Sequence, residues 1–202
     1  MLRPPRVTVR WVPSDAELLL TVEAAWVTAF GPIRSRGSVS FVGVLPIDVL
    51  RFGPDDAGTV RYATVGMART PMADPSAVVV DAKSAPRAEL VLALAERRDS
   101  VLRTMAMLAS APAVEGIVLV PDSTVDTGQA LWDGSVFTAV LVDVPELADV
   151  AIGTGAPIRL LPVIPVTATE LAYRRTQGAA ALRAAWQEAG TDLLDPGRSP
   201  VR

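Results

Sequence analysis

The apolar residues of this chain lie in short runs, and the length of those runs limits the folds that it can adopt. The longest stretches, at residues 116–121 and 136–142, have the length of β-strands. A membrane-spanning helix needs roughly 18 consecutive apolar residues, and no run approaches that length. Half of the 202 residues are hydrophobic, so the chain can bury a sizeable core. We therefore expect a single folded domain over residues 1–202.

Helical periodicity predicts three helical regions, at residues 14–30, 97–110 and 167–190. The first and third each begin with a capping box, Ser-Asp-Ala-Glu at 14–17 and Thr-Ala-Thr-Glu at 167–170. Pro112 lies beyond the predicted end of the second helix, and Gly178 is a potential break in the third. We expect Trp26 and Trp186 to be buried on the apolar faces of the first and third regions.

Segments with alternating or β-branched apolar residues predict the strands. They lie at residues 6–12, 38–44, 47–52, 60–66, 87–94, 116–120, 136–142 and 158–164. The run at 116–120 is wholly apolar, which is typical of a strand buried on both faces, and the helix before it suggests a crossover unit. Residues 70–77 and 121–134 are predicted loops, and 191–202 form an irregular tail. This order predicts one mixed sheet covered by about three helices.

Cysteine and histidine are both absent from the chain. Without cysteine, disulfides, thiolate nucleophiles and cysteine-based metal sites are excluded. Without histidine, the commonest general base near neutral pH and the usual transition-metal ligand are missing. An enzyme would have to use carboxylates, tyrosine, arginine or the single lysine, Lys83. We predict no catalytic residue, no metal site and no cofactor, with a carboxylate-based hydrolase as the alternative.

The distribution of charge argues against a nucleic-acid partner. The net charge is −3, and the basic residues are spread along the chain without a dense cluster. Binding to a phosphate backbone relies on a basic stripe. The charged start of the chain leads into the segment VTVRW at 7–11 rather than into the apolar stretch of a signal peptide. We expect a cytoplasmic protein that binds neither nucleic acid nor membrane, and its arginine-rich, alanine-rich composition is typical of a GC-rich bacterial genome.

Three short motifs resemble parts of catalytic or ligand-binding sites but lack the surrounding sequence that those sites require. Asp126-Thr127-Gly128 matches the triplet of aspartic proteases, which need two such aspartates, but it occurs once and in a predicted loop, where it favours an Asp-capped turn. Gly153-Thr154-Gly155 lacks the third glycine and the following helix of a nucleotide-binding loop, so it predicts a turn. Asp122, Asp126 and Asp133 share a loop without EF-hand spacing, which favours solvated carboxylates, with a divalent-cation site as the alternative.

Two loops carry residues of the types that bind partner proteins. Met67, Arg69 and Met72 fall within six residues of each other, and two nearby prolines lower the entropy cost of ordering their loop on binding. Trp132 lies in the loop at 121–134. We predict these four as partner-binding residues, with Arg69 and Met72 exposed and close together. The alternative is that the methionines and Trp132 pack in the core.

Several segments taken together resemble the Suppressor of fused domain. The stretch IDVLRF at 47–52 is followed by YATVGMARTPM at 62–72, which matches a strand that leads through a T-x-G-M-S/A motif into a P-M loop. RAELVL at 87–92 matches the next landmark of the family. LPVIPVT at 161–167 and GAAAL at 178–182 are similar to its C-terminal strand and helix. The resemblance extends over roughly residues 35–195, and Gln177 stands where relatives often have a histidine.

The resemblance implies an α+β domain with a mixed, largely antiparallel sheet and no established catalytic residues. In animals the family member binds a transcription factor, whose short peptide adds as a strand between two domains. This chain has room only for the domain that resembles the first of those two. Bacterial relatives are commonly thought to be immunity proteins. We therefore expect a non-catalytic domain that binds another protein, either as an immunity protein that neutralises a toxin or as a regulatory scaffold.

Overall fold

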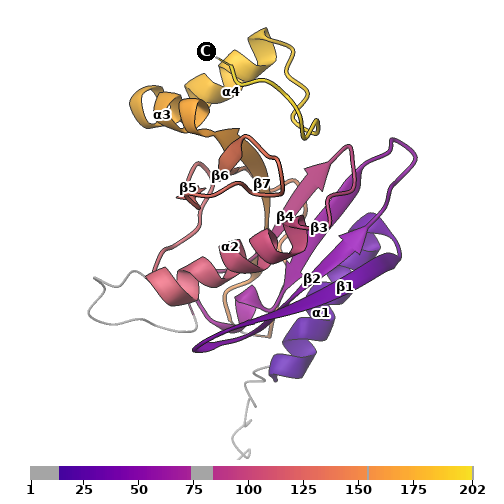
Figure 1. The fold of residues 1–202 in the computed structure, drawn as a ribbon. Helices are drawn as coiled ribbons and strands as arrows, with labels where there is room; N and C mark the ends of the chain where they lie inside the picture. The colour runs from indigo at the N-terminus through magenta and orange to yellow at the C-terminus, as the bar shows by residue number, and fades with distance from the viewer. Residues whose placement is uncertain (1–13, 74–83, 154, 202) are drawn as a thin grey trace, which may run out of the picture.

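One mixed sheet forms the centre of the computed structural model, which describes residues 14–73, 84–153 and 155–201 (Figure 1). Its strands are β1 (Ile33–Phe41), β2 (Val44–Phe52), β3 (Val60–Val65), β4 (Arg87–Leu94), β5 (Thr124–Asp126), β6 (Phe137–Val142) and β7 (Ile158–Thr167). They are ordered β1-β2-β3-β4-β7-β6-β5, and every neighbouring pair is antiparallel except β4 and β7. The predicted α+β class and the largely antiparallel sheet are confirmed. The predicted strand at 6–12 lies outside the described residues.

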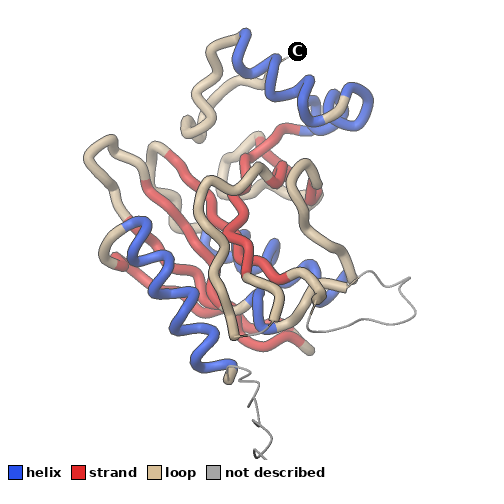
Figure 2. The backbone as a smooth tube through the Cα atoms, turned by 180° about the vertical axis from the view of Figure 1, so that it is seen from behind, coloured by secondary structure: helices blue, strands red, loops and turns tan. Residues whose placement is uncertain are grey.

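The described part of the chain contains four α-helices and one short 3-10 helix. They are α1 (Asp15–Phe30), α2 (Val101–Glu115), α3 (Ala168–Gln177), α4 (Ala179–Glu188) and η1 (Met67–Arg69). Helices α1 and α2 cover opposite faces of the sheet, while α3 and α4 pack at its β6–β7 end (Figures 1 and 2). Gly178, at φ +89°, separates α3 from α4, so the third predicted helical region is two helices. None of the helices among the described residues has the length and apolarity needed to span a membrane.

Helix α1 forms where its capping box predicts it. The Ser14 hydroxyl accepts a hydrogen bond from the Glu17 backbone N–H, and the Glu17 carboxylate accepts one from the Ser14 N–H at 2.8 Å. Trp26, fully buried between α1 and the sheet, donates its indole N–H to the carbonyl of Thr64 on β3 at 2.9 Å. The predicted burial of Trp26 is confirmed, as is that of Trp186 on α4.

The β1–β2 hairpin is longer than the sequence predicts. Strand β1 begins at Ile33 rather than at residue 38, and β2 begins at Val44 and includes Pro46. Pro46 is tolerated there because pairing between β2 and β3 begins only at Asp48, so its missing N–H falls outside that ladder. Strand β3, which lies where the sequence predicts a strand, pairs antiparallel with β2.

The predicted strand at 116–120 is wrong, and so is the crossover built on it. Helix α2 continues past Pro112 to Glu115 and ends at Gly116, which has left-handed φ and ψ. Residues 116–120 then run as a loop, and the parallel partner of β4 is β7. The run is apolar because Ile117, Val118 and Leu119 pack against the core beneath α2, not because they belong to the sheet. The predicted loop at 121–134 also contains the short strand β5.

Candidate functional site

The predicted binding loop is largely buried. Met67 and Met72 are only 5% and 2% exposed and belong to the core beneath α2, so the predicted exposure of Met72 is wrong. Trp132 is 4% exposed and packs with its ring centroid 5.5 Å from that of Phe137. Here the core-packing alternative describes the structure. A partner-binding role for these residues stays a prediction, and of the four only Arg69 keeps a partly exposed side chain.

A buried carboxylate explains why that loop turns inward. Glu89 on β4 is fully buried and accepts hydrogen bonds from the Gly66 N–H at 2.7 Å, the Ala68 N–H at 3.0 Å and the Thr64 hydroxyl at 2.6 Å. These bonds hold η1 on the sheet and direct Met67 into the core. Burial raises the pKa of Glu89, although the hydrogen bonds from Thr64 and the backbone act against that shift. The motifs at 62–72 and 87–92 therefore meet in space.

Two arginines complete this turn by binding carbonyl oxygens. Arg69 donates from Nε to the carbonyl of Gly66 at 3.3 Å and from its guanidinium to the carbonyl of Pro46 on β2. Arg87 donates to the carbonyls of Ala68 and Arg69 at 2.5 and 2.9 Å. The Arg69 side chain is therefore bonded to the backbone while it stays partly exposed, and its partner-binding role stays a prediction.

The three loop aspartates do not converge on one point. Asp122 pairs with Arg183 at 2.6 Å, and Asp126 pairs with Arg175 at 3.3 Å. No group of three acidic residues suited to hold a metal ion occurs in the described ranges. The Asp126 carboxylate accepts a hydrogen bond from the Gly128 N–H at 3.1 Å, as expected of an Asp-capped turn. Gly155 closes a turn before β7 by donating to the carbonyl of Ile152 at 3.1 Å, as predicted for that glycine pair.

A groove of about 330 Å³ opens where β4 and β7 part. Their pairing ends at Leu92 and Val163, and beyond it the Ala95 N–H donates instead to the carbonyl of Leu194 at 2.8 Å. We call this the β4–β7 groove. Its floor comes from β3, β4 and β7, and its walls come from the end of α1, from the loop after β6 with Val144, and from Leu193 and Leu194.

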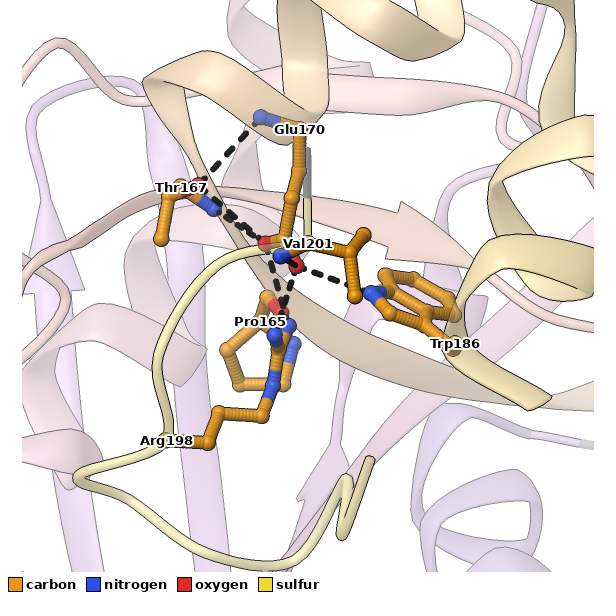
Figure 3. A network of polar contacts seen from close by, with 6 residues as sticks. All are labelled: Pro165, Thr167, Glu170, Trp186, Arg198 and Val201. Atoms are coloured by element: carbon orange, nitrogen blue, oxygen red, sulfur yellow. Dashed lines mark hydrogen bonds and ion pairs between the residues drawn. The ribbon is translucent and has the colours of Figure 1, made fainter. Parts of the chain in front are cut away.

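The C-terminal segment, residues 189–201, is held in place by a buried ion pair. Arg198 donates to both carboxylate oxygens of Glu170, at 2.6 and 3.1 Å, and to the carbonyl of Pro165 at 2.7 Å (Figure 3). Trp186 donates its indole N–H to Glu170 at 2.8 Å, and Thr167 donates its N–H at 2.9 Å (Figure 3). Because Arg198 is tied to the start of α3, Leu193 and Leu194 are fixed as a wall of the groove.

The surroundings of Glu170 favour its charged form. Burial by itself would raise its pKa, but the hydrogen bonds from Arg198, Thr167 and Trp186 outweigh burial and lower it. The Arg198 guanidinium also lies over the rings of Phe137 and Trp186, with 4.8 and 5.3 Å between its central carbon and the ring centroids. The sequence places Glu170 in a capping box but gives no sign of its burial. Arg198 falls in the predicted irregular tail, where no periodic signal marks it.

Two of the three charged side chains that line the β4–β7 groove are in ion pairs, whereas the third, Glu146, makes no ion pair with any described residue. Asp143 accepts hydrogen bonds from Arg183 at 2.6 and 2.9 Å, and Arg61 pairs with Asp55 at 2.6 Å. Burial tends to lower the pKa of Arg183, but its bonds to Asp122 and Asp143 raise it overall. The groove therefore presents mainly apolar side chains, including the 58% exposed Val144. Such a lining suits apolar side chains of a protein segment better than a charged small molecule.

Solved structures of other proteins share this architecture. The match to the crystal structure of a Suppressor of fused homolog from Neisseria gonorrhoeae has a TM-score of 0.68 at 19% identity and covers 92% of this chain and 97% of that one. The match to the crystal structure of a Sufu–Fu complex has a TM-score of 0.65 at 13% identity and covers 94% of this chain and 92% of that one. Against Drosophila Suppressor of Fused the TM-score is 0.66 at 13% identity, and the match spans 94% of this chain but only 51% of that one. No curated protein sequence gives a significant match.

The sequence itself carries the decisive similarity. The model of the family described as Suppressor of fused protein (SUFU) matches residues 43–199, which include Glu89 with its hydrogen-bond donors, the Glu170–Arg198 pair and all of the β4–β7 groove lining except Phe30. A match over that much of the chain, on the same fold, shows that the protein belongs to the Suppressor of fused family.

Proposed function

We propose that residues 1–202 act as one non-catalytic protein-binding domain, and that its role is that of an immunity protein that binds and neutralises a toxin in the bacterial cytoplasm. The observation that carries the proposal is the β4–β7 groove, a concave and mainly apolar site in which two of the three charged lining residues, Asp143 and Arg61, are already paired. A partner side chain entering it would bury apolar surface while leaving those two ion pairs in place. The Sufu–Fu complex supports this reading, because it is a family member bound to another protein.

The state of the buried carboxylates weighs against a carboxylate-based hydrolase. A general acid or base needs a carboxyl group within reach of a substrate. Glu89 and Glu170 are each fully buried and each accept at least three hydrogen bonds from the protein. Neither lines the β4–β7 groove. Of the two carboxylates that do, Asp143 is bound to Arg183, so Glu146 has no free carboxyl group beside it in the lining.

The proposal is tested first by identifying the partner. We would isolate it from the native host with the tagged protein, identify it by mass spectrometry, and express it in bacteria with and without this chain. Immunity predicts that the partner alone arrests growth and that co-expression restores it. A captured partner that is harmless when expressed would support a regulatory scaffold and overturn the immunity role. A reproducible failure to capture any protein would overturn the binding function itself.

A matched pair of variants then tests the groove. Val144→Arg introduces a charge at the groove rim, whereas Val136→Arg introduces the same charge at a residue that is 59% exposed and does not line the groove. Both changes are at exposed positions and should leave the melting temperature nearly unchanged. We expect Val144→Arg to weaken the measured affinity for the partner at least tenfold and Val136→Arg to leave it unaltered. Equal affinities for the two variants would place the partner elsewhere.

A further inference from the structure

Within the part of the chain that the structure describes, strand β1 ends the sheet with an unpaired edge. It is nine residues long, and within the described ranges β2 is its one strand partner (Figure 1). A long free edge exposes a row of backbone N–H and C=O groups that can pair with another strand. The other end of the sheet is formed by β5, which has three residues. The β1 edge is therefore the longer template for strand addition.

The regular part of β1 is symmetric about Gly37. Its pairing with β2 is irregular between Ile33 and Ser35 and again between Val39 and Phe41, so the uninterrupted stretch is residues 35–39. An identical strand placed antiparallel around Gly37 would pair all five of these positions. A pairing centred one residue away would bring at least one irregularity into the ladder. The positions of the two irregularities therefore favour the register that is centred on Gly37.

Charge disfavours the two registers centred just N-terminal to Gly37. The cations of β1 are Arg34 and Arg36, both exposed, and Arg36 also pairs with Glu23 and, at 3.0 Å, with Asp48. Centring on Gly37 places Arg36 opposite Ser38 of the second copy, and Arg34 opposite Ser40. Centring on Arg36 would oppose that residue to itself, and centring on Ser35 would oppose Arg34 to Arg36. Like charges directly opposite each other across strands are unfavourable.

The half-buried face of β1 leaves room for a neighbour. Residues 33, 35, 37, 39 and 41 are only partly buried, whereas Ile47 and Val49 on β2 are 1% and 0% exposed. Val39 and Phe41 face the core beneath α2. Beyond the regular stretch, the fully exposed Val42 would come close to Pro32 of the second copy. A second sheet edge would cover these apolar groups.

We propose that two copies of this chain associate through β1, as antiparallel strands related by a two-fold axis at Gly37, to form a continuous fourteen-stranded sheet built from two seven-stranded ones. A two-fold contact of this kind uses the same residues on both copies and closes after two chains. It leaves the β4–β7 groove of each copy free, because that groove lies across β2 and β3 from the β1 edge.

The absence of cysteine makes the axis directly testable. With Gly37→Cys, the two introduced thiols would face each other across the axis, with Cβ atoms about 4.5–5.5 Å apart, close enough for a disulfide. The introduced Cβ would make an ordinary 3.4 Å contact with Leu102, so the fold should tolerate it. With Ser40→Cys as the control, the thiols would be six residues out of register, about 20 Å apart. Mild oxidation with oxidised glutathione should cross-link the first variant and not the second.

Ser38 offers a pair of variants with opposite expected effects. Ser38 lies beside Asp48 within one chain and would lie opposite Arg36 of the second copy. Ser38→Arg creates two like-charge pairs in the dimer, and we expect it to raise the dimer dissociation constant about tenfold. Ser38→Glu creates two opposite-charge pairs and should lower that constant. Sedimentation equilibrium over a range of protein concentrations measures it.

Two outcomes would overturn the proposal. One is a monomer at all concentrations, with no more cross-linking of Gly37→Cys than of Ser40→Cys, which would mean that β1 does not pair with a second copy. The other is a dimer whose dissociation constant is the same in both Ser38 variants, which would place the interface on a different surface.

Discussion

At the scale of single residues, the structure rests on two buried carboxyl groups in contrasting surroundings. Glu89 is surrounded by neutral donors, and burial raises its pKa. Glu170 contacts the Arg198 guanidinium, and its pKa is lowered. A buried ion pair contributes little compared with an apolar pair of the same shape, but removing one partner is costly because the other charge stays buried. The two sites therefore predict different responses to substitution and to pH.

Arg198→Met is expected to lower the free energy of unfolding by about 3–5 kcal/mol, because it leaves the Glu170 charge buried without a partner. Arg175→Met is the matched control. Its partner Asp126 is partly exposed, so the expected loss is below about 1 kcal/mol. Urea denaturation measures both. The double variant Arg198→Met with Glu170→Gln should recover part of the loss, and a double variant no better than the single one would contradict this account.

The pH dependence of stability should report the Glu170 pair. The folded pKa of Glu170 lies below its unfolded value of about 4.3, so the unfolded state binds more protons in acid. Its contribution is complete above about pH 4.3 and is lost as the pH falls through the folded pKa. We expect the difference in unfolding free energy between the natural protein and Glu170→Gln to shrink below about pH 4.3. A difference that is constant from pH 3 to 7 would contradict the ion pair.

Arg69→Glu should now be a destabilising change. If Arg69 acted only in partner binding, as the sequence predicts, this substitution would weaken partner capture and spare the melting temperature. In the structure, Arg69 donates to the carbonyls of Gly66 and Pro46, and hydrogen bonds from charged groups contribute about 1.5–3 kcal/mol. We expect a loss of that order in a thermal or urea melt. An unchanged melt together with weakened capture would restore the original hypothesis.

At the scale of elements, helices α1 and α4 each carry one buried tryptophan that bonds the helix to a neighbouring element. Trp26 ties α1 to β3 through the Thr64 carbonyl, and Trp186 ties α4 to α3 through the Glu170 carboxylate. In both cases the ring fills the core while its N–H satisfies a buried acceptor. The alignment of each helix therefore depends on packing and on one directional bond.

Truncating either tryptophan to alanine is expected to cost about 3–5 kcal/mol. The variant Trp26→Phe separates the two contributions, because it keeps an aromatic ring and removes the donor to Thr64. We expect it to lose about 1–3 kcal/mol, less than Trp26→Ala. Chemical denaturation followed by circular dichroism measures these differences. Equal losses for Phe and Ala would mean that ring packing contributes little there.

At the scale of the whole molecule, the amino-acid composition limits which metals the protein can bind. A chain without cysteine or histidine lacks the ligands that transition metals prefer. We expect elemental analysis of the purified protein to find no zinc, iron or copper near one equivalent per chain. A stoichiometric metal that resists dialysis would contradict this expectation and would require a site built from oxygen ligands alone.

The sequence by itself determined the local elements and the family. The capping boxes at 14–17 and 167–170, the break at Gly178 and most strands are visible because caps, glycines and apolar periodicity act over a few residues. Only the tertiary structure decided that β4 pairs with β7, that residues 116–120 form a loop, and that Met67 and Met72 face inward. The inward turn of Met67 and the wall of the groove depend on Glu89 and Arg198 meeting groups 21 to 33 residues away in the chain. Burial, pairing and the shape of a groove arise from such distant contacts, which no local pattern encodes.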